Sequence, residues 1–188
     1  MRIILASASP RRSAILSHAG IDYQVHVSDI EECSTKSTPA EVVEELSKQK
    51  AEDVAGKYPE DVLVIGADTV VSIGDRILGK PKDTEDAVSM IRVLSGQTHQ
   101  VYTGVTLCHQ GKSHTFHVKT DVSVSYLNEQ EIMNYVNSGE PFDKAGAYAI
   151  QGLFGKYITQ IHGEYNNVVG LPIAAIYAKC KSLGIEIM

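Results

Sequence analysis

Two adjacent arginines, Arg11 and Arg12, stand where a helix is predicted to begin and form a candidate anion site. Ser9 and Pro10 precede them, and these residue types are favoured as a helix N-cap and at the first helical position. A helix N-terminus already carries about half a positive charge, so each arginine there costs about 0.3–1 kcal/mol. Backbone N–H groups and two guanidinium groups together would bind an anion, and phosphate fits them best. The alternative is that both arginines point into solvent and the cost is tolerated.

Carboxylates supply the second kind of chemical group. Asp68 follows a predicted buried strand at 62–65, among small residues, and is a candidate catalytic or metal-binding group. Such groups are commonly placed where a buried strand ends beside a crevice. An aspartate that only hydrogen-bonds to a turn is the alternative. Glu31 and Glu32 lie in a polar loop. Two adjacent glutamates are more commonly part of an acidic surface loop, unless other candidate site residues lie beside them.

Two lysines are further candidates for contact with an anion. A helix predicted at 39–55 places Lys50 near the middle of its apolar stripe. Its ammonium group would either extend outward to solvent, as inward-facing lysines usually do, or project into a cleft towards an anion. Lys80 lies in a stiff loop between Gly79 and Pro81.

Strands and helices alternate along the chain and would position these side chains. Strands are predicted at 3–6, 23–27, 62–65, 70–73, 76–78, 104–109, 114–126 and 157–161. Helices are predicted from Pro10 to near Gly20 and at 39–55, 84–94, 128–136 and 172–183. Thr38 and Pro39 mark the start of the second helix, and a capping box of Asn128 with Glu131 marks the start of the fourth. Gly74 and Asp75 predict a two-residue hairpin turn, and Gly111 and Lys112 predict the turn between the strands at 104–109 and 114–126. No stretch resembles a linker or a repeat, so we expect one domain over residues 1–188.

Composition excludes several classes of protein. The net charge of −6 argues against a general nucleic-acid binder, so phosphate chemistry must depend on a local basic site. The 3 cysteines are scattered and form no CxxC pair, which indicates neither a disulfide framework nor a zinc site. The N-terminal apolar run is too short for a signal peptide or a membrane span, and we expect a cytoplasmic location without membrane attachment.

Six segments resemble, in this order, the Maf proteins, a family of nucleoside-triphosphate pyrophosphatases first described as septum-formation inhibitors. The segments are SASPRR, GADTVV, GKP, SGQTHQVYTG, EPFDKAGAYAIQG and GEYNNVVGLP. Each one alone is a weak signal, but six in register cover nearly the whole chain. The resemblance implies an α/β fold like that of the inosine-triphosphate pyrophosphatases. Such a fold has a long twisted mixed sheet, flanking helices and a deep cleft between two lobes.

The resemblance also implies roles for individual residues. Asp68 corresponds to the catalytic base and would act with Arg12, Lys50 and Lys80. Substrate binding and base specificity would depend on Ser7, Arg11, Thr69 and Gln151, and the last three look like the family branch that takes dTTP and UTP. Glu32 and Asp68 would hold a divalent metal, Mg²⁺ or Mn²⁺, since hard cations prefer carboxylate oxygens.

The implied reaction is hydrolysis of a nucleoside triphosphate between its α and β phosphates, giving the monophosphate and pyrophosphate. One alternative is a pool-cleaning enzyme for modified nucleotides such as 7-methyl-GTP. Another is a non-catalytic, nucleotide-binding regulator of septum formation. A phosphatase that releases orthophosphate stepwise is a weaker alternative. A homodimer is suggested by the resemblance alone.

Overall fold

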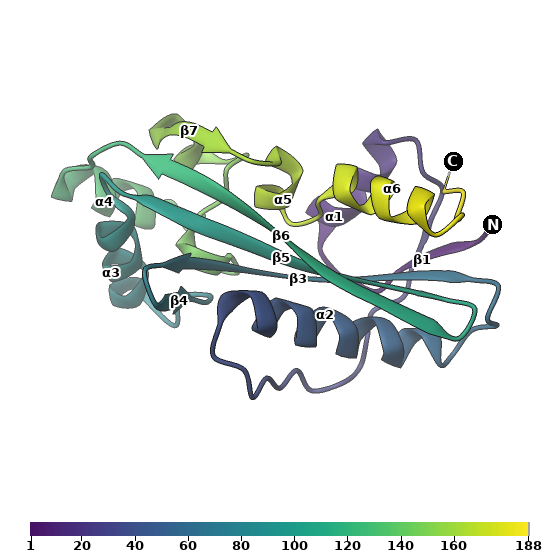
Figure 1. Cartoon of the computed structure of the whole chain (residues 1–188). Helices are drawn as coiled ribbons and strands as arrows, with labels where there is room; N and C mark the ends of the chain where they lie inside the picture. Colours follow the sequence, from purple (N-terminus) through teal and green to yellow (C-terminus); the bar gives the residue numbers. More distant parts are fainter. Residues whose placement is uncertain (188) are drawn as a thin grey trace. The chain divides into compact units, whose positions relative to one another are not determined.

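A mixed β-sheet with helices on its faces forms the computed structural model, which describes residues 1–187 (Figure 1). The strand order is β2-β1-β3-β5-β6-β7, and β4 pairs with β3. The strands are β1 (Ile3–Leu5), β2 (Gln24–Val25), β3 (Leu63–Ile73), β4 (Arg76–Leu78), β5 (Thr98–His109), β6 (Lys112–Val124) and β7 (Ile158–His162). Strand β1 pairs parallel with β2 and β3, whereas the pairs β3–β4 and β6–β7 are antiparallel. The predicted mixed α/β fold is confirmed.

Six α-helices and two short 3-10 helices complete the part of the chain that the structure describes. The helices are α1 (Pro10–His18), α2 (Pro39–Ala55), α3 (Thr84–Leu94), α4 (Glu129–Val136), α5 (Tyr165–Val169), α6 (Ile173–Ser182), η1 (Ala145–Ala147) and η2 (Leu153–Tyr157). Five of the α-helices were predicted, and their ends follow local signals. Thr38 caps α2 ahead of Pro39, and Asn128 forms a complete capping box with Glu131 at the start of α4.

The backbone contacts divide the chain into two compact units. Unit 1 comprises Met1–Asp68, Thr103–Val118 and the chain from Gly170 onward, and unit 2 comprises Thr69–Tyr102 and Lys119–Val169. Strands β3, β5 and β6 each contribute residues to both units. The organisation of the chain as one domain stays a prediction.

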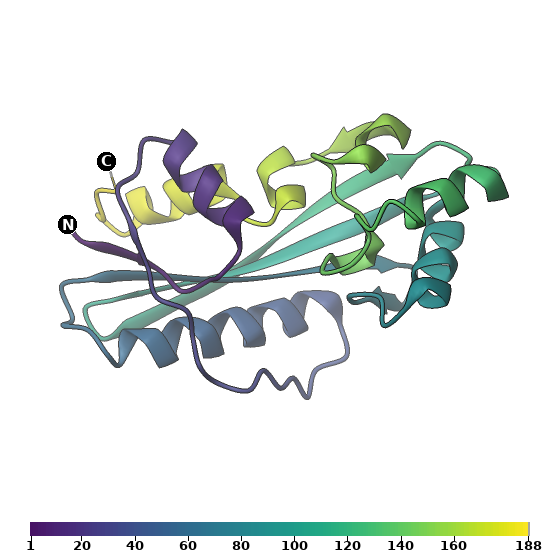
Figure 2. The same ribbon diagram turned by 180° about the vertical axis from the view of Figure 1, so that it is seen from behind.

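In unit 1, helix α2 lies along one face of the sheet, and α1 and α6 lie on the other (Figures 1 and 2). Two glycines allow α2 to approach the strands closely. A Cβ atom at Gly66 on β3 would stand 2.5 Å from the Ser47 carbonyl oxygen, and one at Gly104 on β5 would overlap the Val43 carbonyl. The helix presents a buried stripe of mostly small residues to these glycines: Val43, Ser47, Ala51 and Val54. The missing side chains at Gly66 and Gly104 therefore determine how closely α2 packs against the sheet.

Strand β3 is longer than predicted, and this changes the setting of Asp68. The sequence predicts a strand that ends at Ile65, but β3 continues without a break to Ile73. Strand β1 pairs only with residues 63–65 of β3, so Asp68 lies just beyond the end of that neighbour. The prediction that the strand carrying Asp68 ends before this residue was wrong. It is the adjacent strand that ends there, since the pairing of β1 with β3 stops at Ile65.

The β5–β6 hairpin also differs from prediction in its length and its turn. Both strands begin earlier than expected, at Thr98 and Lys112. The turn residues are Gln110 and Gly111, with φ of 51° and 69°, one position before the predicted pair. Two successive positive φ values are typical of the tight turns that match the twist of a hairpin.

Unit 2 has its own core, in which a buried histidine is neutral. His99 is 0% exposed, and its Nε2 lies 2.7 Å from the Tyr148 hydroxyl. Its Nδ1 is buried without a hydrogen-bond partner among residues 1–187. Burial lowers the pKa of His99 from 6.5 to about 4, because an imidazolium here would lose its hydration.

This burial predicts a loss of stability in mild acid. The unfolded chain takes up a proton at His99 below pH 6.5, whereas the folded chain does so only near pH 4. The stability contributed by the neutral ring is therefore complete above pH 6.5 and is lost as the pH falls towards 4. We expect this group to lower the free energy of unfolding by about 2 kcal/mol between pH 7.5 and pH 5. Urea denaturation at both pH values checks this.

The matched variants are His99→Gln, which cannot titrate, and His18→Gln, which removes an exposed histidine in α1. His99→Gln should flatten the pH dependence of the unfolding free energy, and His18→Gln should leave it as in the wild type. An equal dependence in all three proteins would contradict the assignment.

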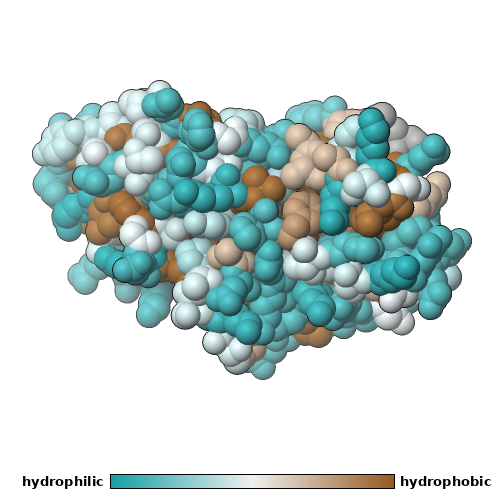
Figure 3. Space-filling view, viewed as in Figure 1, coloured by the Kyte–Doolittle hydropathy of each residue, from teal (hydrophilic) through white to brown (hydrophobic). Residues whose placement is uncertain are grey.

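Hydrophilic residues cover most of the face that Figure 3 shows. Figure 3 shows apolar residues in separate small patches on one face, surrounded by polar ones. Over residues 1–187, no helix combines the length and the apolar character needed to cross a membrane.

Candidate active site

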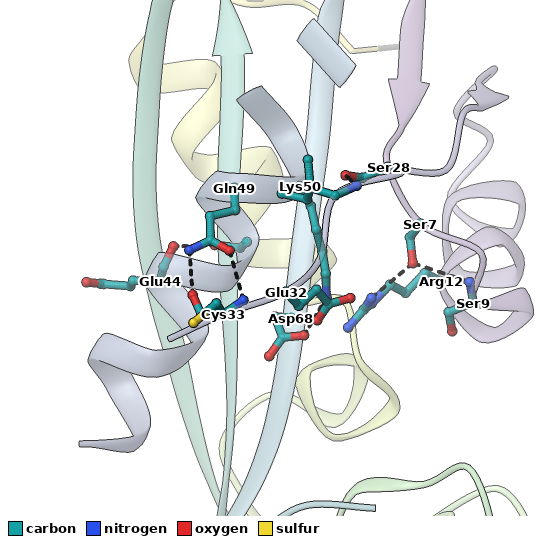
Figure 4. Close-up of polar contacts among 12 residues, drawn as sticks. Ser7, Ser9, Arg12, Ser28, Glu32, Cys33, Glu44, Gln49, Lys50 and Asp68 are labelled. Carbon is teal, nitrogen blue, oxygen red and sulfur yellow. Dashed lines mark hydrogen bonds and ion pairs between the residues drawn. The ribbon is translucent and has the colours of Figure 1, made fainter. Parts of the chain in front are cut away.

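Lys50, Asp68 and Glu32 form the centre of the candidate site in unit 1 (Figure 4). The ammonium group of Lys50 donates to Asp68 Oδ1 at 2.6 Å and lies 3.0 Å from Glu32 Oε2. The side chains of Lys50 and Asp68 are only 12% and 14% exposed, whereas that of Glu32 is 50% exposed. The alternative in which Lys50 extends outward to solvent was wrong. Two carboxylates here surround one cation at a partly open position.

Arg12 is fixed by two further contacts. Its Nε donates to the Gly170 carbonyl at 2.8 Å, and its Nη1 donates to Ser7 Oγ at 3.0 Å. The buried Ser7 hydroxyl also accepts the backbone N–H of Ser9 at 3.3 Å. The Ser9 side chain makes no capping bond, although its extended backbone precedes the helix as predicted. Arg12 is therefore bonded to the protein and does not extend into solvent, and its guanidinium group points towards Asp68 (Figure 4).

The charges around Arg12 leave the site suited to a polyanion. Burial lowers the pKa of Arg12, and the neighbouring charge of Arg11 acts in the same direction. The carboxylates of Asp68 and Glu32 act in the opposite direction. Lys50 and Arg12 balance the charge of these two carboxylates, and Arg11 next to Arg12 adds one further positive charge. A triphosphate would supply the negative charge that balances this excess.

The loop that carries Glu32 is tied to one flank of α2. Ser34 Oγ donates to Glu45 at 2.6 Å, and Ser28 Oγ donates to Asp53 at 2.8 Å. Between them, the side-chain amide of Gln49 bonds to both backbone groups of Cys33 (Figure 4), with 2.7 Å to the carbonyl oxygen. These contacts hold Glu32 beside Lys50.

Sequence reasoning missed this loop attachment, although a signal exists. Glu45, Gln49 and Asp53 recur at intervals of four, which places their side chains in one row along the helix. A polar row next to the apolar stripe indicates a surface that binds polar backbone. The hydroxyl of Ser34 lowers the pKa of Glu45, and the hydroxyl of Ser28 lowers that of Asp53, so both acceptors are held as carboxylates.

A metal site with three or more side-chain ligands is absent from residues 1–187. Glu32 and Asp68 nevertheless fit a divalent cation, because they already hold a cation, the ammonium of Lys50, between them. Mg²⁺ is usually bound by one or two carboxylates together with water and substrate phosphates. The donor set is therefore adequate for a metal that arrives with a nucleotide.

Three of the predicted site residues belong to unit 2. Thr69 directly follows Asp68 on β3 and is partly buried, and Lys80 is exposed in the loop after β4. Gln151 is exposed in the turn between η1 and η2. Arg11 lies in the first turn of α1 and is partly buried. The structure brings together five predicted residues (Ser7, Arg12, Glu32, Lys50 and Asp68), and the roles of the others stay predictions.

Known protein sequences match this chain over nearly its whole length. A family model described as "Maf-like protein" matches residues 2–183. A dTTP/UTP pyrophosphatase of Agathobacter rectalis is 50% identical, and the match covers 99% of each chain. One of the same name from Lachnoclostridium phytofermentans is 48% identical, over 100% of this chain and 98% of the relative. One from Bacillus cereus is 45% identical, over 99% and 97%.

A solved structure shares the fold. The Staphylococcus aureus Ham1 protein superimposes with a TM-score of 0.50 over 97% of this chain and 100% of that one. The two sequences are 15% identical. At this identity the likeness concerns the arrangement of the backbone alone.

Proposed function

Because this chain belongs to the Maf family, we propose that it hydrolyses dTTP and UTP to the nucleoside monophosphate and pyrophosphate. The observation that carries the proposal is the cluster of Lys50, Asp68 and Glu32 next to the fixed guanidinium of Arg12. The names of relatives at 45–50% identity over nearly full length support the substrate class.

Each residue of the cluster has a role in the proposed reaction. Asp68 accepts the proton of the water that attacks the α-phosphorus. Lys50 holds the Asp68 carboxylate in place through its 2.6 Å hydrogen bond. Arg12, with Lys50 and Lys80, stabilises the negative charge that develops on the departing pyrophosphate. No covalent intermediate is required.

A divalent cation, Mg²⁺ or Mn²⁺, is proposed to bind at Glu32 and Asp68. When bound, it would neutralise phosphate charge and polarise a phosphoryl oxygen.

Glu32→Gln is expected to raise the metal concentration for half-maximal activity by about tenfold, because it removes one of two anionic ligands. Titration of Mg²⁺ at saturating dTTP measures this. Glu31→Gln, at the exposed neighbouring position, is the matched control and should behave as the wild type. An unchanged metal requirement in Glu32→Gln would remove Glu32 from the metal site.

Arg12→Ala is expected to raise KM for dTTP about tenfold or more, because a charge-assisted contact to phosphate is lost. Steady-state kinetics checks this. Arg76→Ala, which removes an exposed arginine, is the control. Constants equal to those of the wild type would contradict a phosphate contact by Arg12.

Product analysis tests the proposed function directly. The purified protein is incubated with a panel of nucleoside triphosphates and Mg²⁺ or Mn²⁺, and nucleotides, pyrophosphate and orthophosphate are resolved. We expect monophosphate and pyrophosphate from dTTP and UTP, with little turnover of purine nucleotides. Preferred turnover of 7-methyl-GTP would favour an enzyme for modified nucleotides. Stepwise release of orthophosphate would indicate a phosphatase, and no turnover would indicate a binding regulator.

Base preference is proposed to depend on Thr69 and Gln151, which would hydrogen-bond to the polar edge of the pyrimidine. Sites of this kind reject other bases because their own polar groups are then left unpaired.

A further inference from the structure

Glu140, in the loop after α4, directs its carboxylate onto the turn that precedes and begins η2. Its Oε2 accepts the backbone N–H of Leu153 at 2.7 Å, and its Oε1 accepts that of Phe154 at 3.3 Å. The Tyr135 hydroxyl donates to the same Oε1 at 3.1 Å. One carboxylate thus receives three donors, two of which belong to the backbone of a single turn. The start of η2 has no side-chain cap from its own N-cap residue, Gly152, and Glu140 supplies the acceptors instead.

The backbone of Glu140 is held as well. Lys144 Nζ donates to the Glu140 carbonyl at 2.6 Å, and the Glu140 N–H bonds to Ser138 Oγ at 3.3 Å. These contacts fix the position from which the carboxylate extends. The side chain therefore acts from a rigid base.

Tyr135 connects this carboxylate to the core of unit 2. It is 4% exposed, and its ring lies 5.0 Å from that of Phe154. Its hydroxyl also lies 3.2 Å from the Ala147 carbonyl. Burial, followed by the negative charge of Glu140, raises the pKa of Tyr135, so that the phenol remains a hydrogen-bond donor.

Gly152 shows how closely the carboxylate fits the turn. A Cβ atom at this position would overlap both carboxylate oxygens of Glu140. The φ of Gly152 is −108°, which any residue can adopt, so the conflict of a side chain here is with the Glu140 carboxylate. A methyl group would push the carboxylate away from the N–H groups of Leu153 and Phe154.

The turn ordered in this way presents two exposed side chains. The Gly152 N–H closes the turn onto the Ala149 carbonyl at 3.2 Å. At its tip, Gln151 is exposed and its amide forms no hydrogen bond within residues 1–187, and Leu153 is 56% exposed. A half-buried carboxylate that holds a turn with an exposed amide and an exposed apolar side chain is the arrangement of a preorganised binding loop.

We propose that Glu140 is a positioning residue for pyrimidine recognition, which orders residues 149–154 so that the Gln151 amide meets the base at a fixed place. The proposal rests on the proposed function, in which Gln151 contributes to base preference. Glu140 itself does not touch the substrate. A loose turn would lose conformational entropy when the substrate binds, and Glu140 avoids this loss by ordering the turn beforehand.

Two variants break the anchor in different ways. Glu140→Gln turns one acceptor into a donor that faces an N–H group, and Gly152→Ala displaces the carboxylate without changing any charge. Glu129→Gln is the matched control, because Glu129 is an exposed glutamate of α4 that bonds to Arg92 and not to the turn. Hydrogen–deuterium exchange of a peptide covering residues 149–155 reports the order of the turn.

We expect both anchor variants to exchange at least tenfold faster over residues 149–155 and to raise KM for dTTP about tenfold, with kcat within about threefold of the wild type. The ratio of kcat/KM for dTTP over CTP should fall. A Glu140→Gln/Gln151→Ala double variant should lose little more than Gln151→Ala alone, because Glu140 acts through Gln151. Glu129→Gln should change none of these values.

Several outcomes would overturn the proposal. These are unchanged exchange over 149–155, unchanged KM despite faster exchange, or additive losses in the double variant. Equal losses of kcat for every nucleotide, together with a lowered midpoint of thermal unfolding, would make Glu140 a structural brace only. Wild-type protein that releases no pyrophosphate from dTTP or UTP would instead overturn the proposed function, so the two failures are separable.

Discussion

Replacing Asp68 with asparagine is expected to lower kcat for dTTP and UTP by about a thousandfold, with the fold and KM largely retained. An amide has nearly the size of a carboxylate, but it cannot accept a proton from water. Lys50 keeps its contact with Glu32 at 3.0 Å, so its buried ammonium still has an anionic partner. Steady-state kinetics with pyrophosphate detection measures the loss.

Asp61→Asn is the matched control, since Asp61 is an exposed aspartate just before the same strand. It should retain full turnover. Circular dichroism and the midpoint of urea unfolding establish that Asp68→Asn is folded. Turnover of Asp68→Asn within a few-fold of the wild type would remove Asp68 from the role of general base.

Gly104→Ala is expected to have the largest effect on stability. A Cβ atom at this position of β5 would overlap the Val43 carbonyl carbon and oxygen, which belong to the backbone of α2 and cannot rotate away. Helix α2 would have to shift from the sheet, and Lys50 would shift with it. We expect the free energy of unfolding to fall by about 3 kcal/mol, at the upper end of overpacking effects. Urea denaturation monitored by circular dichroism checks this.

Gly56→Ala, at the C-cap of the same helix, provides the comparison. Its φ is −60°, and an added Cβ would stand 3.6 Å from the nearest carbonyl oxygen, an ordinary contact. This variant should be as stable as the wild type or more stable by up to about 1 kcal/mol. Similar unfolding free energies for both variants would show that the close approach at Gly104 is not required.

The sequence by itself determined where most helices begin and end, and which charged side chains are candidates for the site. Thr38 with Pro39, and Asn128 with Glu131, predicted two helix starts that the structure confirms. These signals are readable because a capping bond joins residues three apart in the chain.

The sequence left the orientation of the charged side chains open. Lys50 could have extended to solvent, and Arg12 could have pointed into water. Tertiary contacts decided both, through Asp68 for the lysine and through Gly170 for the arginine, which is 158 positions distant in sequence. Local pattern cannot predict such contacts, because desolvation and pairing depend on groups that only the fold brings together.

Which strand ends beside Asp68 was likewise decided by the tertiary structure. Asp68 was predicted at the end of its own strand, but β3 continues and β1 ends beside it. Gln49, which holds the loop of Glu32, belongs to a row of polar residues that the sequence shows, whereas Glu140, which holds the turn of Gln151, is visible in the sequence only as an ordinary polar residue. Both side chains matter because they form hydrogen bonds with backbone N–H and C=O groups of segments that are distant in the sequence. Such bonds exist only when folding brings the side chain within about 3 Å of those groups.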